Sequence, residues 1–199
     1  MQDQKPLSSM FKAQRGVSLI VVMLILIVVS LLGVGAAQIS LMSERGARND
    51  RDQLVAWQSA EAALNDAEFD MFDKTAHANT RQALFDGKNT VVFPAGCGTT
   101  GSSKGLCASV SSGKPAWLTV DFTSTAADAP TTPFGAFTGR TFAAGGTGIQ
   151  PARLPRYVIE LVPDPSGDKS SPSYLYRVTA MGFGPRADTQ AVLQILYRN

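Results

Sequence analysis

The two cysteines are the first residues whose type and spacing suggest a chemistry. Cys97 and Cys107 are the only cysteines in the 199 residues, and the nine residues between them are mostly Gly, Ser and Thr. A metal site needs further ligands nearby, and the sequence offers none. Outside the cytoplasm such a pair forms a disulfide that closes a loop. We therefore expect a disulfide, which in the chain-entropy model stabilises the fold by about 3 kcal/mol.

Two enzyme motifs overlap this loop. Residues 96–101 fit the dinucleotide-binding pattern G-x-G-x-x-G, which needs a strand before it and a helix after it. Residues 102–105 are poor helix formers, so we expect a glycine-rich loop and no cofactor. Residues 101–105 fit the G-x-S-x-G pattern of hydrolases, in which the catalytic histidine follows the serine. The only histidine, His77, precedes it. We predict no enzyme, and we expect His77 in solvent just after a helix.

Asp164 and Asp168 are the remaining candidates for a metal site. They lie in the sequence Asp-Pro-Ser-Gly-Asp-Lys, where carboxylates and carbonyls are ligands that calcium accepts. A polar hairpin turn explains the same residues, and we predict no metal; calcium is the alternative. Residues 17–199 hold 15 basic and 15 acidic groups. This balance and the dispersed arginines predict no nucleic-acid partner.

An uncharged apolar segment near the N-terminus dominates the sequence pattern. No charge occurs from residue 16 to residue 43, and residues 17–37 contain only two polar residues, Ser18 and Ser30. As a helix, these 21 residues would span roughly 31 Å, the thickness of a bilayer's hydrocarbon core. Basic residues precede the segment, so the positive-inside rule places the N-terminus in the cytoplasm. With 44% hydrophobic and 17% charged residues, the composition excludes a plain cytosolic globule and a disordered chain.

Two processing routes compete for this segment. A signal peptidase would cut after Val34-Gly35-Ala36, before Ala37, although the apolar run is longer than in most signal peptides. Alternatively, a short basic leader is removed after Gly16 and the whole helix is retained.

The next stretch, residues 44–74, has no proline and is rich in helix formers. Its small and apolar residues recur every three or four positions and form a narrow stripe: Ala56, Ala60, Ala63 and Ala67, with Leu64 and Met71 alongside. We expect Asp66, Asp70 and Asp73 on a different face, in water. One helix over 17–74 would be roughly 87 Å long. Cleavage before Ala37 would cut it in the middle, which favours cleavage after Gly16.

The residues of this helix resemble a known family. The leader ends in Gly16 and the apolar helix starts at Val17, as in type IV pilins. The second half is similar to the PilX-type minor pilins, through Glu44, Arg45, Ala47, Asn49, Arg51, Asp52, Ala56, Gln58, Ala60, Glu61, Ala62, Ala63, Leu64, Asp66, Ala67 and Glu68. The resemblance covers about residues 14–69, with a weaker match in the C-terminal strands. It implies that a prepilin peptidase cuts after Gly16 and N-methylates Val17.

The sequence departs from major pilins at two positions. These usually begin with phenylalanine, where this chain has Val17, and carry a glutamate at the fifth mature position, where it has Val21. In the family picture, that glutamate pairs with the N-terminal amine of a neighbouring subunit, because an unpaired charge in apolar surroundings is costly. Its absence suits a scarce subunit at the tip or in a priming complex. The tip subunit of the type II secretion pseudopilus similarly lacks this glutamate.

The rest of the chain predicts a sheet after a long irregular region. Thr, Ala and Gly make up 18 of the 30 residues in 121–150, so we expect a surface loop that supplies little core. Short edge strands are expected at residues 91–93 and 117–120. Three clearer strands, at 157–162, 174–181 and 191–197, are joined by turn-rich links.

We expect an α+β, pilin-like fold in which the amphipathic half of the helix packs on an antiparallel sheet. The expected divisions are a leader at 1–16, a membrane and assembly helix at 17–43, its amphipathic continuation at 44–75, a loop-rich region at 76–155 and a meander at 156–199.

The expected function is association. The resemblance implies a minor pilin with roles in pilus biogenesis, twitching motility and surface attachment. Its implied partners are other minor pilins, the major pilin, the prepilin peptidase, the inner-membrane assembly platform, membrane lipid and a PilY-type tip adhesin. We expect a single pass through the inner membrane with the C-terminal domain in the periplasm, followed by the pilus. The alternatives are a minor pseudopilin of type II secretion, and a signal-anchored or secreted periplasmic enzyme.

Overall fold

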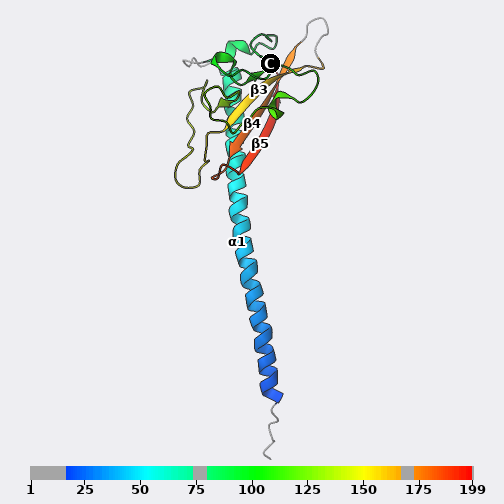
Figure 1. The fold of residues 1–199 in the computed structure, drawn as a ribbon, viewed down its shortest axis with the longest axis vertical. Coiled ribbons are helices and arrows are strands. Elements are labelled where there is room, and N and C mark those ends of the chain that lie inside the picture. Colours follow the sequence, from blue (N-terminus) through cyan, green and yellow to red (C-terminus); the bar gives the residue numbers. More distant parts are fainter. Residues whose placement is uncertain (1–16, 74–79, 167–172, 199) are drawn as a thin grey trace, which may run out of the picture. The chain divides into compact units, whose positions relative to one another are not determined.

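The computed structural model describes residues 17–73, 80–166 and 173–198. The chain forms two compact units, Met1–Ala47 and Arg48–Asn199, and the first α-helix, α1 (Val17–Phe72), contributes to both (Figure 1). The helix ends two residues before the bound expected from sequence. In the first unit, every described side chain from Ser18 to Ala47 is exposed. The core of the protein therefore lies in the second unit.

The second unit is built on a five-stranded mixed sheet. Its long strands, β3 (Arg156–Pro163), β4 (Tyr174–Phe183) and β5 (Gln190–Tyr197), form the expected antiparallel meander. Two strands of two residues each join β3: β1 (Leu106–Cys107) pairs with it in parallel and β2 (Thr132–Pro133) antiparallel. The α+β fold is confirmed, and the parallel β1 makes the sheet mixed.

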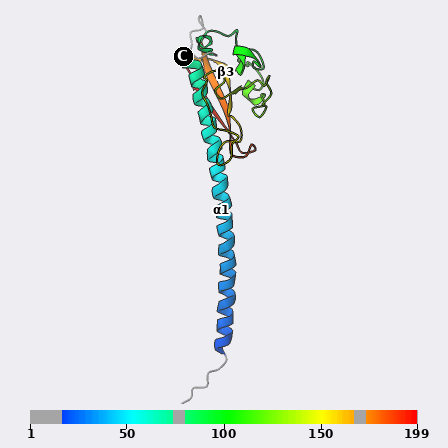
Figure 2. The ribbon, with the colours of Figure 1, turned by 90° about the vertical axis from the view of Figure 1, so that its left-hand side faces the viewer.

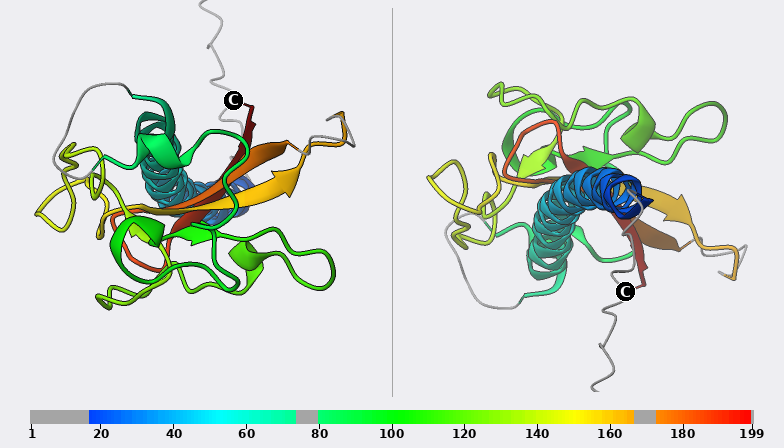
Figure 3. Two further views of the ribbon diagram at one scale, coloured as in Figure 1. Left: turned by 90° about the horizontal axis from the view of Figure 1, so that it is seen from above. Right: turned by 90° about the horizontal axis from the view of Figure 1, so that it is seen from below.

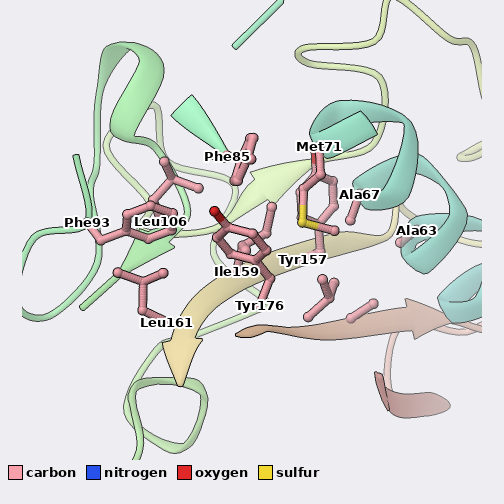
Figure 4. Close-up of a cluster of buried hydrophobic side chains, with 12 residues drawn as sticks. Ala63, Ala67, Met71, Phe85, Phe93, Leu106, Tyr157, Ile159, Leu161 and Tyr176 are labelled. Atoms are coloured by element: carbon pink, nitrogen blue, oxygen red, sulfur yellow. The ribbon is translucent and has the colours of Figure 1, made fainter. Parts of the chain in front are cut away.

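Strand β3 is covered on both faces, as Figures 2 and 3 show for the second unit. On one face, Tyr157, Ile159 and Leu161 join the stripe of α1 in the larger core (Figure 4). On the other face, Val158 packs in a smaller core with the disulfide and Phe122. All six residues from Arg156 to Leu161 are buried, which explains why this strand alternates only weakly in sequence.

Small residues let α1 approach the sheet closely. The stripe residues Ala56, Ala60, Ala63 and Ala67 are fully buried, as expected. Opposite them on the sheet lie Gly182 and Ala191, which are neighbours across β4 and β5. A Cβ atom at Gly182 would collide with the backbone of Ala60 and Ala56. Helix and strand therefore meet with almost no side chain between them.

The structure corrects three expectations for residues 76–155. Residues 91–93 form a turn, and Val91 is 91% exposed. Trp117 lies in a 3-10 helix, Ala116–Leu118, where the N–H groups of Ala116 and Trp117 donate to Glu160 of β3. Residues 121–150 do contribute core, because Phe122 and Phe134 are buried, as are Thr131, Thr132 and Thr138. Single large side chains anchor this Thr-, Ala- and Gly-rich segment.

Candidate functional site

The exposed apolar segment of α1 is the first candidate site. From Ser18 to Ser43 the helix carries no charge, and its large side chains are exposed. Within the described residues, α1 is the helix long and apolar enough to cross a membrane, by length and composition. The hydroxyl of Ser30 donates to the carbonyl of Leu26 at 2.7 Å, so this polar group is satisfied within the helix. The segment presents an apolar surface suited to lipid or to another helix.

The motif residues of the second half do not gather at one place. Leu64 packs against the core, and Asp52 pairs with neighbouring Arg51 at 2.9 Å. Glu68 accepts a hydrogen bond from the hydroxyl of Tyr197 on β5 at 3.2 Å. Burial, followed by the charge of Glu68, raises the pKa of Tyr197 to about 12. Five further motif residues are exposed: Glu44, Arg45, Asn49, Gln58 and Glu61.

The expectation that the helix aspartates face water is wrong. Asp66 and Asp70 are buried, with 0% and 4% of their surface exposed, and Asp73 is partly buried just after the helix. Asp70 lies seven residues after Ala63, which is nearly two full helical turns, so the two residues share a face. The carboxylates of Asp66 and Asp70 are part of the packed side of α1, and each has specific hydrogen-bond and ion-pair partners.

Asp70 and Arg81 form a buried ion pair that sequence reasoning missed. The guanidinium contacts the carboxylate at 2.6 Å, and 1% and 0% of the two side chains are exposed. The hydroxyl of Tyr157 donates to the same carboxylate at 2.8 Å. Arg81 also donates to the carbonyls of Ser102 and Lys104, at 2.9 and 2.6 Å. The pair joins α1, β3 and the disulfide loop. No spacing in the sequence connects Arg81 to these partners.

Asp66 holds the long 121–150 segment to the helix. Its carboxylate accepts hydrogen bonds from the N–H of Gly135 at 2.7 Å and from the hydroxyl of Thr138 at 2.5 Å. The guanidinium of Arg140 lies 3.8 Å away. Burial raises the pKa of Asp66 above its ordinary value, and the two hydrogen bonds and Arg140 oppose this rise.

Two family models match this chain over most of its length. Residues 15–65 match the model described as PilX N-terminal, and residues 103–199 match the model described as Type IV pilus assembly protein PilX C-term. The chain belongs to the PilX family of type IV pilus assembly proteins. No curated protein and no solved structure matches it.

The two PilX matches cover different secondary-structure elements. The N-terminal match covers most of α1, and the C-terminal match covers β1 to β5. The stretch 66–102 between them contains Asp70 and Arg81. The buried pair that joins the helix to the sheet thus lies in the part of this PilX chain that neither model matches.

The expected disulfide is confirmed. Cys97 and Cys107 are bonded, and both belong to the smaller core of the PilX fold. The structure explains the glycine motif around them without a cofactor: a Cβ atom at Gly98 would collide with the carbonyl of Ser103, and Gly96 and Gly101 have positive φ angles that favour glycine. The motif leads into a three-residue 3-10 helix, Gly101–Ser103, instead of the long helix that a dinucleotide site needs.

Three residues named in the sequence analysis lie outside the described residues. These are Gly16, His77 and Asp168. Asp164 is described, and its carboxylate accepts hydrogen bonds from Ser166 and contacts Arg198 at 3.2 Å. The hydrogen bonds from Ser166 lower the pKa of Asp164, with a smaller contribution from Arg198.

Proposed function

We propose that this PilX-family protein is a minor pilin that primes or joins type IV pilus assembly through helix packing and subunit contacts. The observation that carries the proposal is the uncharged, fully exposed run Ser18–Ser43 at the start of a helix whose later part is buried against a folded sheet. An all-round apolar helix suits lipid before assembly and the helices of other pilins afterwards. The chemistry is association, with no catalytic step.

The proposed topology is based on the charge pattern. The leader 1–16 carries Lys5, Lys12 and Arg15, so it lies in the cytoplasm and the second unit in the periplasm. Prepilin peptidase cuts after Gly16 and methylates the amine of Val17. The continuity of α1 through Val34–Ala37 supports this route, since cleavage before Ala37 would divide the helix.

The proposed partners are other minor pilins, the major pilin, the inner-membrane assembly platform and a PilY-type tip adhesin. Twitching motility and surface attachment are the proposed cellular roles. Val21 stands where a shaft-forming pilin carries an acid, which supports a position at the tip or in a priming complex. The same feature supports the second candidate, a minor pseudopilin of type II secretion.

Intact mass and N-terminal sequencing of the protein from the native cell envelope test the proposal. A start at N-methylated Val17 is the expected result. A start at Ala37 would mean a secreted domain and would overturn it. Deleting the gene then separates the two candidates, because loss of surface pili supports the pilus role and loss of exported enzymes with normal pili supports the pseudopilin.

A further inference from the structure

A small apolar hollow opens in the second unit, away from the stripe of α1. It has a volume of about 320 Å³, and its apolar walls come from Phe122, Leu154 and Phe183. Arg153 and Arg156 also line it. The volume lies at the lower end of the range for ligand pockets, roughly 300–1,000 Å³, and suits one or two side chains better than a whole cofactor.

Arg156 is a buried cation for which the described residues provide no anionic partner. Only 7% of its surface is exposed. Its guanidinium donates to the hydroxyl and the carbonyl of Thr131, at 2.6 and 2.9 Å, and both acceptors are neutral. Among the described residues no carboxylate forms an ion pair with it. The buried guanidinium of Arg81, in contrast, has Asp70. Burial lowers the pKa of Arg156, and the pKa of Lys104 is lowered first by burial and then by the positive charge of Arg156.

Arg153 adds a second guanidinium at the rim of the hollow. It is exposed, donates to the carbonyl of Thr123 at 3.0 Å, and lies 5.9 Å from the centre of the Phe183 ring. The nearby carboxylate of Asp121 accepts hydrogen bonds from Thr123 and makes no ion pair with Arg153 among the described residues. The hydrogen bonds that the two arginines donate within the fold thus go to neutral oxygens, and the charge of Arg153 makes only a minor contribution to lowering the pKa of Asp121.

We propose that this hollow, the Arg153–Arg156 pocket, binds an acidic side chain next to a large apolar side chain on a partner protein. A buried positive charge is costly unless it is paired with an anion, and hydrogen bonds between a guanidinium and a carboxylate are among the strongest in proteins. The apolar walls take the neighbouring side chain, as an anchor residue does at the centre of an interface. The class of partner, an assembly protein outside the cytoplasm, rests on the proposed function.

In-cell photo-cross-linking tests the pocket on the full chain. A benzophenone amino acid replaces Leu154, which lines the pocket and is 41% exposed. The control carries it at Val91, which does not line the pocket. We expect position 154 to cross-link to one segment of an assembly protein, with Asp or Glu within two residues of a large apolar residue. Position 91 should not cross-link to that segment.

Charge reversal then tests the role of the arginines. Arg153→Glu should lower the yield of the cross-link at position 154 by roughly tenfold or more. Reversing the acidic residue of the partner segment to Arg should restore the yield. The matched control is Arg186→Glu, because Arg186 is exposed and lies 3.5 Å from Asp188. This control should leave the yield unchanged.

The possible outcomes distinguish failure of the pocket proposal from failure of the proposed function. A partner segment without an acidic residue, a lipid adduct, no cross-link at position 154, or an unchanged yield with Arg153→Glu would each overturn the pocket. Normal incorporation of the chain into pili in the same cells would leave the proposed function standing. A mature start at Ala37 together with the expected cross-link would overturn the function and retain the pocket.

Discussion

Buried carboxylates organise the second unit at the scale of single residues. Asp66, Asp70 and Glu160 are each less than 5% exposed. Asp66 and Glu160 accept hydrogen bonds from backbone N–H groups of irregular segments, and Asp70 accepts them from Arg81. A buried charge is costly unless hydrogen bonds and an opposite charge compensate for its lost hydration. These acids therefore hold the loops against the helix and the sheet, a role that a larger apolar core would otherwise fill.

Removing Arg81 leaves the carboxylate of Asp70 buried without its cation. We expect Arg81→Met to lower the free energy of unfolding by about 3–5 kcal/mol, the usual cost of breaking one side of a buried ion pair. Denaturant unfolding of the full chain in detergent, followed by the fluorescence of Trp57 and Trp117, measures this. The control is Arg186→Met at an exposed position, with an effect within about 0.5 kcal/mol. Equal effects of the two changes would contradict a structural role for the pair.

Asp66 should make stability depend on pH in a defined direction. Burial raises its pKa in the folded state above the ordinary value of 3.8. Below pH 3.8 the carboxyl is protonated in both the folded and the unfolded protein, and its contribution to stability is fully present. This contribution is lost as the pH rises from 3.8 through the pKa of the folded state. The free energy of unfolding of the wild type, minus that of Asp66→Asn, should therefore fall from acid to neutral pH. A difference that rises over this range would show that the folded pKa is depressed.

The roles of these residues were beyond sequence reasoning for a physical reason. The stripe of Ala56 to Ala67 was predictable, because it depends on the helical period alone. Whether a carboxylate beside that stripe faces water depends on what the chain places opposite it. Arg81 reaches Asp70, and Thr138 reaches Asp66, only after the loops have folded over the helix. Sequence spacing contains no such information.

At the scale of elements, the long strands were predictable and the short ones were not. β3, β4 and β5 have turn-rich links and, in β4 and β5, alternating residues. β1 and β2 contain two residues each and exist because the edge of β3 that does not pair with β4 is free to pair with them. Val91, Val92 and Phe93 are residue types that favour strands, but no neighbouring strand pairs with them in the described structure.

Gly182 sets the distance between β4 and α1. We expect Gly182→Val to lower the free energy of unfolding by about 1–3 kcal/mol or more, because the new side chain meets helix backbone that cannot move alone. Val192→Ala, on exposed β5 surface, serves as the control with an effect within about 0.5 kcal/mol. Thermal unfolding of both variants measures the difference. A neutral Gly182→Val would mean that helix and sheet separate easily.

The disulfide should matter for the loop more than for the sheet. Replacing both Cys97 and Cys107 with Ser should lower the free energy of unfolding by about 3 kcal/mol. The rate of amide hydrogen exchange should rise most in residues 96–107 and least in β4. Within 96–107, the carbonyls of Ser102 and Lys104 accept hydrogen bonds from Arg81. Uniformly faster exchange across the sheet would show instead that the bond supports the whole domain.

At the scale of the molecule, the division into two units matches the division of labour that we propose. The first unit presents exposed apolar side chains, and the second has its own core. The sequence was sufficient to predict the long helix with an apolar start and a packed continuation, because a long uncharged run and an amphipathic stripe are strong patterns. The pocket at Arg153 and Arg156 was not predictable, since its walls come from three separate segments.

Introducing an acid at position 21 should change where the proposed pilus subunit is found. In the minor pilin that we propose, Val21→Glu would provide a carboxylate able to pair with the N-terminal amine of a neighbouring subunit. We expect the variant along the shaft of the pilus as well as at its end, and immunogold labelling of purified pili counts the difference. Val21→Gln, which lacks the charge, is the control. Identical labelling of wild type and Val21→Glu would show that another feature limits the subunit to its position.

The packing of α1 against the last strand has a consequence for biosynthesis. Glu68 and Tyr197 are 129 residues apart, and Ala56 packs with Ala191 across a similar length of chain. Such distant pairings make a fold slow to reach, and apolar surface left uncovered in the meantime favours aggregation. The ribosome finishes the helix long before it makes β5. The new chain is thus most vulnerable to proteases and to its own copies between those two events.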